Sequence, residues 1–491
     1  MKLFKNQFLF VPKNIISAQK IECYSSFAID DYNVYLGEAC NYALVQKGHV
    51  FSLLLGYVVD AKGHELEENV LIESFLTSIE DDSRNVANCV RYWGGRWCLI
   101  YQTDNGINVI TDTCGLKQVF YYTYIQRGCI TVASQARYIA ETYYLEECKQ
   151  ARTYIDNAQK IDKEYSWPLD GCLYERVKRL LPNHILKEGC KSVERIIIEK
   201  HVSEDPATEM TELLRTQMSN IQKKGKCAVT ITAGWDSRLV LATADKKDME
   251  LVPVTLLYWG SNEDNLDVRV AREICGRVGL EHKLVRCSEI RPDFREEYHQ
   301  FGELPHEYWM QMNQAVINAG LGEYYWVKGS CNEVLRASSG VLYGWQVSAK
   351  LLCKLFGLHF DNYSDVIISK WIEDAKPYCK QYGIGLLDLF YWEHRCGSWL
   401  AQCLNESDIA GEMFSPFNCR AYIDAGTNVP YQERVSPHYN LFNTILKKTS
   451  FDINIPINHG RYSSLSSIIW CFIKNRMPVL YGLIARIIPL K

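Results

Sequence analysis

The first two hundred residues alternate short apolar runs with turn-forming residues, at intervals of about ten positions. Apolar runs separated by Asn, Asp and Gly are typical of strands joined as antiparallel hairpins. We expect strands at residues 52–60, 96–101, 108–112, 119–122 and 130–133. Residues 68–79 differ, because Val70, Leu71, Phe75 and Ile79 recur at helical spacing and predict a helix.

The pattern changes beyond a polar stretch at residues 200–208, which contains Pro206 and which we take as the domain boundary. Strand-like runs then alternate with helix-like segments, as in βαβ units built on a parallel sheet. We expect strands at 227–232, 251–258 and 283–285, and helices at 211–223, 237–244 and 267–278. From about residue 304 onward the pattern is mostly helical. The chain is therefore predicted to be α/β, with domains at 1–204 and 205–491.

Composition excludes several classes of protein. Hydrophobic residues make up 47% of the 491 positions and charged residues 23%, which argues against general disorder. The net charge of −4 gives no sign of nucleic acid binding through charge. The 19 cysteines are scattered, without CxxC pairs or zinc spacing. We interpret them as buried thiols of a protein in a reducing cytoplasm.

The C-terminal tail from Ser467 to Leu490 is strongly apolar, although Lys474, Pro478 and Arg486 interrupt it. No window of about twenty residues is continuously apolar, so no membrane-spanning helix is expected. The start of the chain has no signal-peptide pattern. We favour a helix that packs on the domain. An interfacial helix in weak contact with a membrane surface is the alternative.

The chemistry is concentrated in Thr232-Ala233-Gly234-Trp235-Asp236-Ser237, where an apolar strand passes through a small-residue turn into a helix. Gly234 is predicted to permit a positive φ. Thr232, Ser237 and the first helix amides can hold a pyrophosphate-sized anion. Asp236 would repel phosphate unless Mg²⁺ lies between them. The alternative is an ordinary βα turn with an N-capping side chain.

This turn resembles the SGGxDS pyrophosphate loop of the asparagine synthetase-like family, which includes β-lactam synthetases and lasso-peptide cyclases. Residues 329–333, Gly-Ser-Cys-Asn-Glu, are similar to the second acidic loop of that family, GxGxDE. The acidic position falls on Glu333, or on Asn332 if the register shifts by one. We prefer Glu333, because a carboxylate is what a second Mg²⁺ contact needs.

Other segments extend the resemblance over nearly the whole chain. Residues 55–60, 94–99, 112–122 and 180–184 are similar to the N-terminal glutaminase-like part of the family. Residues 391–399 and 455–458 look like asparagine synthase-like proteins encoded with bacterial surface-polysaccharide genes. The implied fold is a glutaminase-like (Ntn) αββα sandwich, followed by a PP-loop parallel-sheet α/β domain with added helices.

Glutaminases of this family need Cys directly after the initiator Met, where its thiol attacks and its free amine acts as base. Position 2 is Lys2 here, and the next cysteine is Cys23. The resemblance therefore implies a glutaminase-like domain without glutaminase activity. Free ammonia, or an amine on the acceptor, becomes the expected nucleophile.

The resemblance implies an ATP-dependent ligase that activates a carboxylate as an acyl-adenylate, releases pyrophosphate and forms an amide. By family position, ATP would contact Thr232, Ala233, Gly234, Asp236, Ser237, Arg238, Leu256, Tyr258 and Gly329, with Leu256 and Tyr258 flanking adenine. Asp236 and Glu333 would act in catalysis by holding Mg²⁺. A late catalytic lysine is expected, for which Lys447 and Lys448 are candidates.

The expected partners are a small-molecule or peptide carboxylate and an amine or ammonia, without nucleic acid, and a homodimer is left open. Glu393, His394, Arg395 and Trp399 either line the acceptor pocket or form a structural ion pair. Two other functions remain: an intramolecular lactam or macrolactam cyclase, and a non-enzymatic ATP-binding or scaffold protein.

Overall fold

The computed structural model describes the chain outside residues 16–20, 64–66, 82–85, 105, 124–128, 188–191, 198–202, 259, 288, 337–338, 437, 452–454, 456, 458–464 and 488–491. Three expectations fall partly outside the described residues. They are the first positions of the predicted boundary, 200–202, Pro456 and Asn458 of the segment 455–458, and residues 488–490 of the apolar tail.

The N-terminal part contains twelve named strands. They are β1 (Phe8–Pro12), β2 (Ser25–Ile29), β3 (Tyr32–Leu36), β4 (Tyr42–Lys47), β5 (Val50–Asp60), β6 (Trp93–Thr103), β7 (Gly106–Thr111), β8 (Phe120–Tyr122), β9 (Val132–Ala133), β10 (Val177–Arg179), β11 (His184–Lys187) and β12 (Ser192–Arg195). They form two antiparallel six-stranded sheets, ordered β10-β8-β9-β1-β3-β2 and β12-β11-β7-β6-β5-β4. The five strands expected in this part are confirmed as β5 to β9.

Alternation along the strands decides how the two sheets pack. Leu53 and Leu55 of β5 share one core with Phe8 and Phe10 of β1, so this core lies between the sheets. Leu54 belongs instead to the cluster under the helix of residues 68–81. Successive side chains of a strand point to opposite faces, so one strand serves both layers.

Helices cover the outer faces of both sheets. They are α1 (Glu68–Asp81), α2 (Val86–Cys89) and α3 (Ala136–Tyr143), whereas α4 (Lys149–Ile161) packs against the helix of residues 362–382. Leu71, Phe75 and Ile79 of α1 pack on the second sheet, whereas Val70 is exposed and was wrongly placed on that face. Residues of α3 pack on the outer face of the first sheet. The layers are therefore αββα, as the resemblance implied.

The C-terminal part contains a five-stranded sheet in which every neighbouring pair is parallel, ordered β15-β14-β13-β16-β17. Its strands are β13 (Cys227–Thr230), β14 (Leu251–Leu257), β15 (Lys283–Arg286), β16 (Tyr325–Val327) and β17 (Met413–Phe414). The three expected strands are confirmed as β13, β14 and β15. The two short strands β16 and β17 have no clear signal in the sequence.

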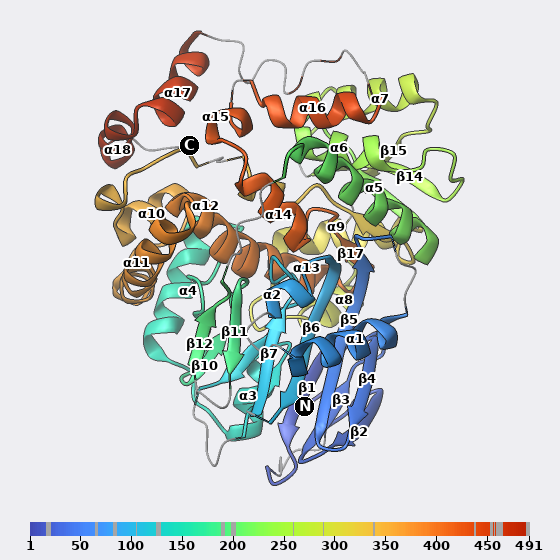
Figure 1. The fold of residues 1–491 in the computed structure, drawn as a ribbon, viewed down its shortest axis with the longest axis vertical. Helices are drawn as coiled ribbons and strands as arrows, with labels where there is room; N and C mark the ends of the chain where they lie inside the picture. Colours follow the sequence, from blue (N-terminus) through green and yellow to red (C-terminus); the bar gives the residue numbers. More distant parts are fainter. Residues whose placement is uncertain are drawn as a thin grey trace.

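Helices surround this sheet, in the upper part of Figure 1. They are α5 (Pro206–Lys224), α6 (Trp235–Thr243), α7 (Leu266–Val278), α8 (Pro292–Tyr298), α9 (Glu307–Asn318), α10 (Ala349–Phe356), α11 (Asn362–Tyr382), α12 (Leu386–Phe390), α13 (Ala401–Ser407), α14 (Arg420–Thr427), α15 (Tyr431–Arg434), α16 (Asn440–Lys448), α17 (Leu465–Arg476) and α18 (Pro478–Ile487). Two short 3₁₀ helices, η1 (Asn332–Val334) and η2 (Gly344–Gln346), and a ten-residue π-helix, η3 (Tyr391–Leu400), complete this part.

The sandwich and the parallel sheet are joined by a shared core. Tyr57 and Leu116 of the N-terminal part lie in one hydrophobic cluster with Val229 and Trp326 of the parallel sheet. Polar contacts cross the same junction. For example, the Asn418 side-chain amide donates to the Gly95 carbonyl at 2.6 Å.

Candidate functional site

A cavity of about 350 Å³ lies at the carboxyl ends of β13, β14 and β16. Ligands of open parallel α/β sheets bind at this edge, and the volume suits a small ligand. Eight of the ten residues that the sequence singled out line it: Thr232, Gly234, Asp236, Ser237, Leu256, Tyr258, Gly329 and Glu333. Ala233 and Arg238 do not.

The loop between β13 and α6 is held by its own side chains. The Thr232 and Ser237 hydroxyl oxygens lie 3.0 Å apart, and the Gly234 amide donates to Thr232 Oγ1 at 3.3 Å. The Ala233 amide donates to Asp267 Oδ1, at the start of α7, at 2.9 Å. A carboxylate of the chain thus already accepts a hydrogen bond from the amide of Ala233, a residue that the resemblance assigned to ATP.

Gly234 does not have the predicted positive φ. It is the residue that precedes α6, with φ −80° and ψ 177°, and this extended conformation is open to any residue. Space does not demand a glycine either, because a Cβ there would lie 3.5 Å from Thr232 Oγ1, an ordinary van der Waals contact.

Arg238 is a structural residue rather than a phosphate ligand. Its guanidinium is buried and donates to the Ile455 carbonyl at 2.5 Å and to the Ala233 carbonyl at 3.2 Å. Burial lowers its pKa to about 10. Arg238 therefore fixes the loop from behind instead of lining the cavity.

The two predicted Mg²⁺ ligands share a guanidinium. Arg336 Nη2 lies 2.6 Å from Asp236 Oδ2 and 3.4 Å from Glu333 Oε1. The side-chain amide of Asn332 donates to the other carboxylate oxygen, Asp236 Oδ1, at 2.7 Å. Burial, followed by the charge of Asp236, raises the pKa of Glu333 to about 7.

These contacts do not fit the predicted metal. One nitrogen of Arg336 reaches both carboxylates, so it lies where a cation bridging them would have to be. Both Asp236 oxygens are already engaged. A Mg²⁺ ion held by Asp236 and Glu333 would have to displace the Arg336 guanidinium, against charge repulsion.

The second loop packs tightly against the first. A Cβ on Gly329 would lie 2.8 Å from Asp236 Cβ and 2.9 Å from the Ser237 amide nitrogen, so only glycine fits there. Cys331 stands where GxGxDE has its second glycine, and its φ is +79°. The glycine-like backbone is thus kept although the residue has changed.

Several cavity residues have no counterpart in the sequence prediction. Lys328 follows β16 directly, and burial lowers its pKa to about 8. Its position at a strand end beside Gly329 was the available signal. Neither Lys447 nor Lys448 lines the cavity, and Lys448 pairs with Asp205 at 2.9 Å.

Some residues of the segment 393–399 line the cavity, and others have a structural role. Arg395 and Trp399 line the cavity, with the Arg395 guanidinium carbon 3.4 Å from the Trp399 ring centroid. Glu393 does not line it. Its carboxylate accepts two hydrogen bonds from Arg195, both at 2.9 Å, and one from Trp371 at 2.7 Å. Glu393 therefore forms a structural ion pair, with Arg195.

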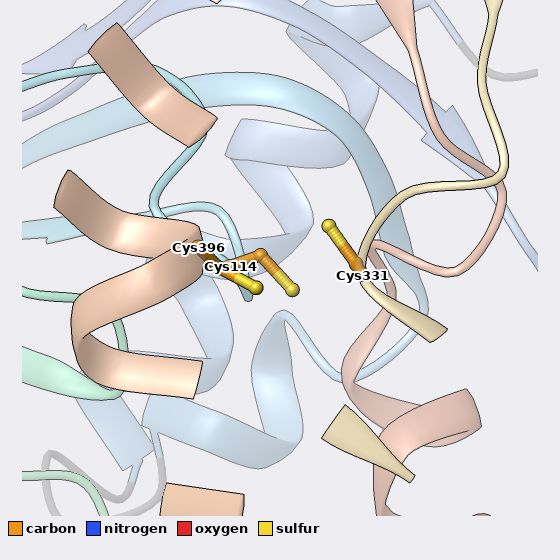
Figure 2. A group of neighbouring side chains, drawn as sticks. All are labelled: Cys114, Cys331 and Cys396. Atoms are coloured by element: carbon orange, nitrogen blue, oxygen red, sulfur yellow. The ribbon is translucent and has the colours of Figure 1, made fainter. Parts of the chain in front are cut away.

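Three of the scattered cysteines meet at the wall of the cavity, which Cys396 lines. The sulfur atoms of Cys114, Cys331 and Cys396 all lie within 4.8 Å of one another, and Figure 2 shows them converging from three segments. Although burial opposes it, hydrogen bonds from the other two thiols lower the pKa of Cys396 to about 5. The sequence gave no spacing signal for this group, because its members are far apart along the chain.

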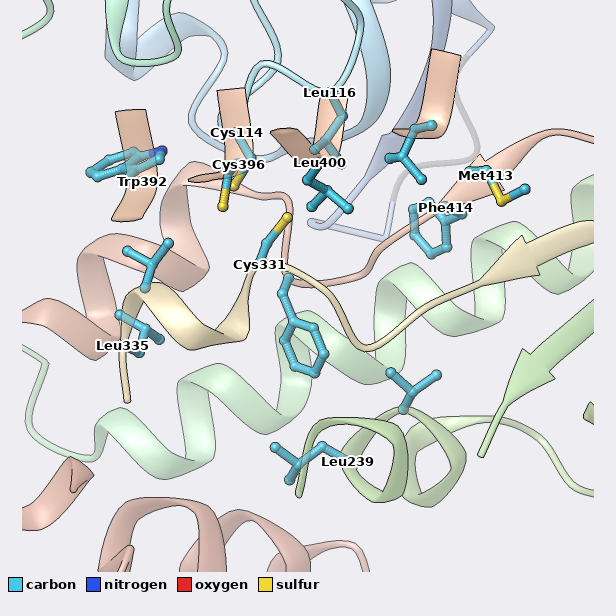
Figure 3. Close-up of a cluster of buried hydrophobic side chains, with 14 of the residues drawn as sticks. Cys114, Leu116, Leu239, Cys331, Leu335, Trp392, Cys396, Leu400, Met413 and Phe414 are labelled. Carbon is cyan, nitrogen blue, oxygen red and sulfur yellow. The ribbon is translucent and has the colours of Figure 1, made fainter. Parts of the chain in front are cut away.

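The surroundings of these thiols are apolar. Leu116, Leu400 and Phe414 are among the buried side chains around them in Figure 3. Three sulfurs are a ligand set for a soft cation. Within the described part of the chain, the group includes no His, Asp or Glu as a fourth ligand. The packing role expected for the cysteines is compatible with this setting.

Comparisons with known proteins add little. No protein-family model matches the chain, and no curated protein matches it. Among solved structures, glutamine-dependent NAD⁺ synthetase from Acinetobacter baumannii in complex with adenosine diphosphate is similar at 13% identity and a TM-score of 0.20. The match covers 37% of this chain and 41% of that one. A TM-score this low does not establish a shared fold.

Proposed function

We propose that the chain is an ATP-using ligase that joins a carboxylate to an amine or to ammonia. The observation that carries this proposal is the convergence of both loops and the Leu256–Tyr258 wall on one cavity. A carboxylate acylates poorly, because oxide would have to leave. Attack on the α-phosphorus of ATP gives an acyl-adenylate and pyrophosphate, and attack by the amine then releases AMP.

The lining residues suit this chemistry. Leu256 and Tyr258 offer a flat, largely apolar wall for adenine, and Tyr258 stacks on Tyr308 with ring centroids 5.5 Å apart. The hydroxyls of Thr232 and Ser237 face the space for phosphates. Lys328 supplies a positive charge close to neutral pH, which would stabilise charge that develops on leaving pyrophosphate.

Arg395 is the residue proposed to hold the acceptor. Its guanidinium lies on Trp399 at the cavity wall and can pair with a substrate carboxylate. Positioning of both reactants accounts for much of the catalysis in such a site. No step is assigned to Mg²⁺, because Arg336 holds Asp236 and Glu333.

A second candidate is a nucleotide-binding protein without ligase activity. Two contacts favour it: the Asp267 carboxylate on the Ala233 amide, and the Arg336 guanidinium between the carboxylates. Both occupy positions that a catalytic site would offer to phosphate or metal.

Mass spectrometry for AMP, pyrophosphate and amide tests the proposal, with ATP, a panel of carboxylates and ammonium or amines. We expect all three products, and a loss of at least about a hundredfold in Lys328→Met. Lys447→Met, outside the cavity, is the matched control and should retain activity. ATP binding by calorimetry without AMP would favour the second candidate. If the protein neither binds ATP nor forms AMP, both candidate functions are contradicted.

A further inference from the structure

Helix α17 presents an apolar stripe to solvent. Leu465, Ile468, Ile469 and Phe472 are 73%, 45%, 50% and 57% exposed. Their spacing of i, i+3, i+4 and i+7 places them on a single face. A soluble helix normally buries such a face, so its exposure marks an interaction surface.

Helix α18 repeats the arrangement. Val479, Leu480, Leu483 and Ile487 are all exposed and again fall at helical spacing. Figure 1 shows α17 and α18 side by side at the outer edge of the C-terminal part, away from the sandwich. Tyr343, which precedes η2, and Trp345, within η2, are also exposed.

The inner side of the pair is anchored by polar contacts. The Gln346 amide donates to the Pro478 carbonyl at 3.0 Å, and the Tyr481 hydroxyl donates to the Ser339 carbonyl at 2.8 Å. Asn475 donates to the Ser436 carbonyl at 3.1 Å. Tyr481 and Ala485 are buried in the main hydrophobic cluster, so the pair packs on the domain as the sequence favoured, while its apolar stripes remain exposed.

The charge of the tail is opposite to that of the chain. The tail from Ser467 to Leu490 contains Lys474, Arg476 and Arg486 but no Asp or Glu, whereas the whole protein carries −4. An apolar stripe with basic residues is typical of helices that lie in the interface of an anionic membrane. A second copy fits less well, because dimerisation would bring two basic tails together.

Neither helix spans a bilayer by itself. Among the described residues no single helix is long and apolar enough, and α17 with α18 passes the same test only as a pair bent by 114°. At 1.5 Å per residue the two are about 18 and 15 Å long, against a hydrocarbon core of about 30 Å. Their length and bend suit a position along the surface.

We propose that α17 and α18 dock the protein on an anionic lipid surface. The exposed stripes enter the boundary between headgroups and acyl chains, and the exposed Arg476 contacts lipid phosphates. This inference does not rest on the proposed ligase activity, which involves the cavity at the carboxyl ends of β13, β14 and β16.

Vesicle flotation with the full chain tests the inference. We expect binding to vesicles of phosphatidylglycerol and phosphatidylethanolamine, weaker binding to phosphatidylcholine alone, and a further decrease in high salt. Ile469→Asp/Phe472→Asp should lower partitioning at least tenfold. Met249→Asp, which changes a 95% exposed side chain elsewhere, is the matched control. Thermal melting verifies that all variants fold.

Two results would overturn the inference. One is equal partitioning of the wild type and the double variant. The other is a lipid-free dimer, seen by light scattering, that the double variant abolishes without any vesicle binding by the wild type. AMP formation without lipid is measured in parallel, so that failure of docking and failure of the ligase proposal remain distinguishable.

Discussion

At the scale of single residues, a guanidinium takes the place of the metal that the sequence predicted. Asp236 and Glu333 both line one cavity, and Arg336 could pair with Glu333 by its i+3 spacing, but nothing along the chain indicated that it would also pair with Asp236. Arg336 was the third residue after Glu333, on the same turn. Only the bend of the chain around η1 brings it between the two carboxylates.

Replacing Arg336 by Met tests this charge arrangement. Asp236 and Glu333 would face each other without a counter-ion, so we expect a loss of about 3–5 kcal/mol in the free energy of unfolding. Urea unfolding measures it. Millimolar Mg²⁺ should restore part of the loss in Arg336→Met and should not affect the wild type. Equal stabilisation of both proteins by Mg²⁺ would show that the metal coexists with Arg336.

The buried His394 predicts how the free energy of unfolding depends on pH. Burial, and then the charges of Arg395 and Arg179, lower its pKa to about 3, against about 6.5 in an unfolded chain. Between these values the unfolded chain binds a proton that the folded chain does not. Stability from this residue is therefore present above pH 6.5 and is lost as the pH falls, by up to about 1.4 kcal/mol per unit.

His394→Asn should flatten this acid dependence while leaving an acceptor for the Leu169 amide, which now donates to His394 Nδ1 at 3.3 Å. The measurement is urea unfolding at several pH values between 4 and 8. His438→Asn, at an exposed position, is the control. Identical slopes for wild type and His394→Asn would contradict the prediction.

At the scale of elements, the site depends on close contact between two loops. The turn before α6 was recognisable from its small residues, whereas the conformation of Gly329–Glu333 was not. Gly329 touches the backbone of α6, and this contact depends on how β13 and β16 lie side by side in the sheet. A strand of three residues such as β16 carries too little periodicity to be predicted alone.

Gly329→Ala tests the contact. Its methyl group would overlap the first turn of α6, so we expect a loss of about 1–3 kcal/mol in stability and at least tenfold weaker ATP binding. Calorimetry measures the binding and urea unfolding the stability. Gly276→Ala in α7, where a Cβ meets nothing within 4 Å, should be neutral or slightly stabilising. Similar behaviour of both variants would exclude the packing argument.

At the scale of the whole molecule, the N-terminal and C-terminal parts share a buried interface. Arg96 of β6 is buried with its Nη1 2.7 Å from Asp408 Oδ1 and 2.9 Å from Glu412 Oε1. The hydrophobic cluster beneath the parallel sheet continues into the sandwich. A large shared interface of this kind favours cooperative unfolding.

Arg96→Met is therefore expected to cost about 3–5 kcal/mol, because two buried carboxylates lose their partner. Differential scanning calorimetry should show one transition for the wild type and two for the variant. Arg152→Met, which removes an exposed pair with Glu147, should change stability by less than about 1 kcal/mol. Two transitions already in the wild type would disprove the cooperative junction.

The sequence by itself determined the α/β class, the antiparallel strands β5 to β9, the alternation of strands and helices after α5, and the loop at Thr232–Ser237. These follow from local periodicity and turn chemistry, which neighbouring residues carry. Only the tertiary structure decided that Arg336 pairs with Asp236, that three cysteines meet, and that α17 and α18 expose an apolar face. Those features depend on contacts between distant segments, because charge pairing and burial are set by neighbours in space.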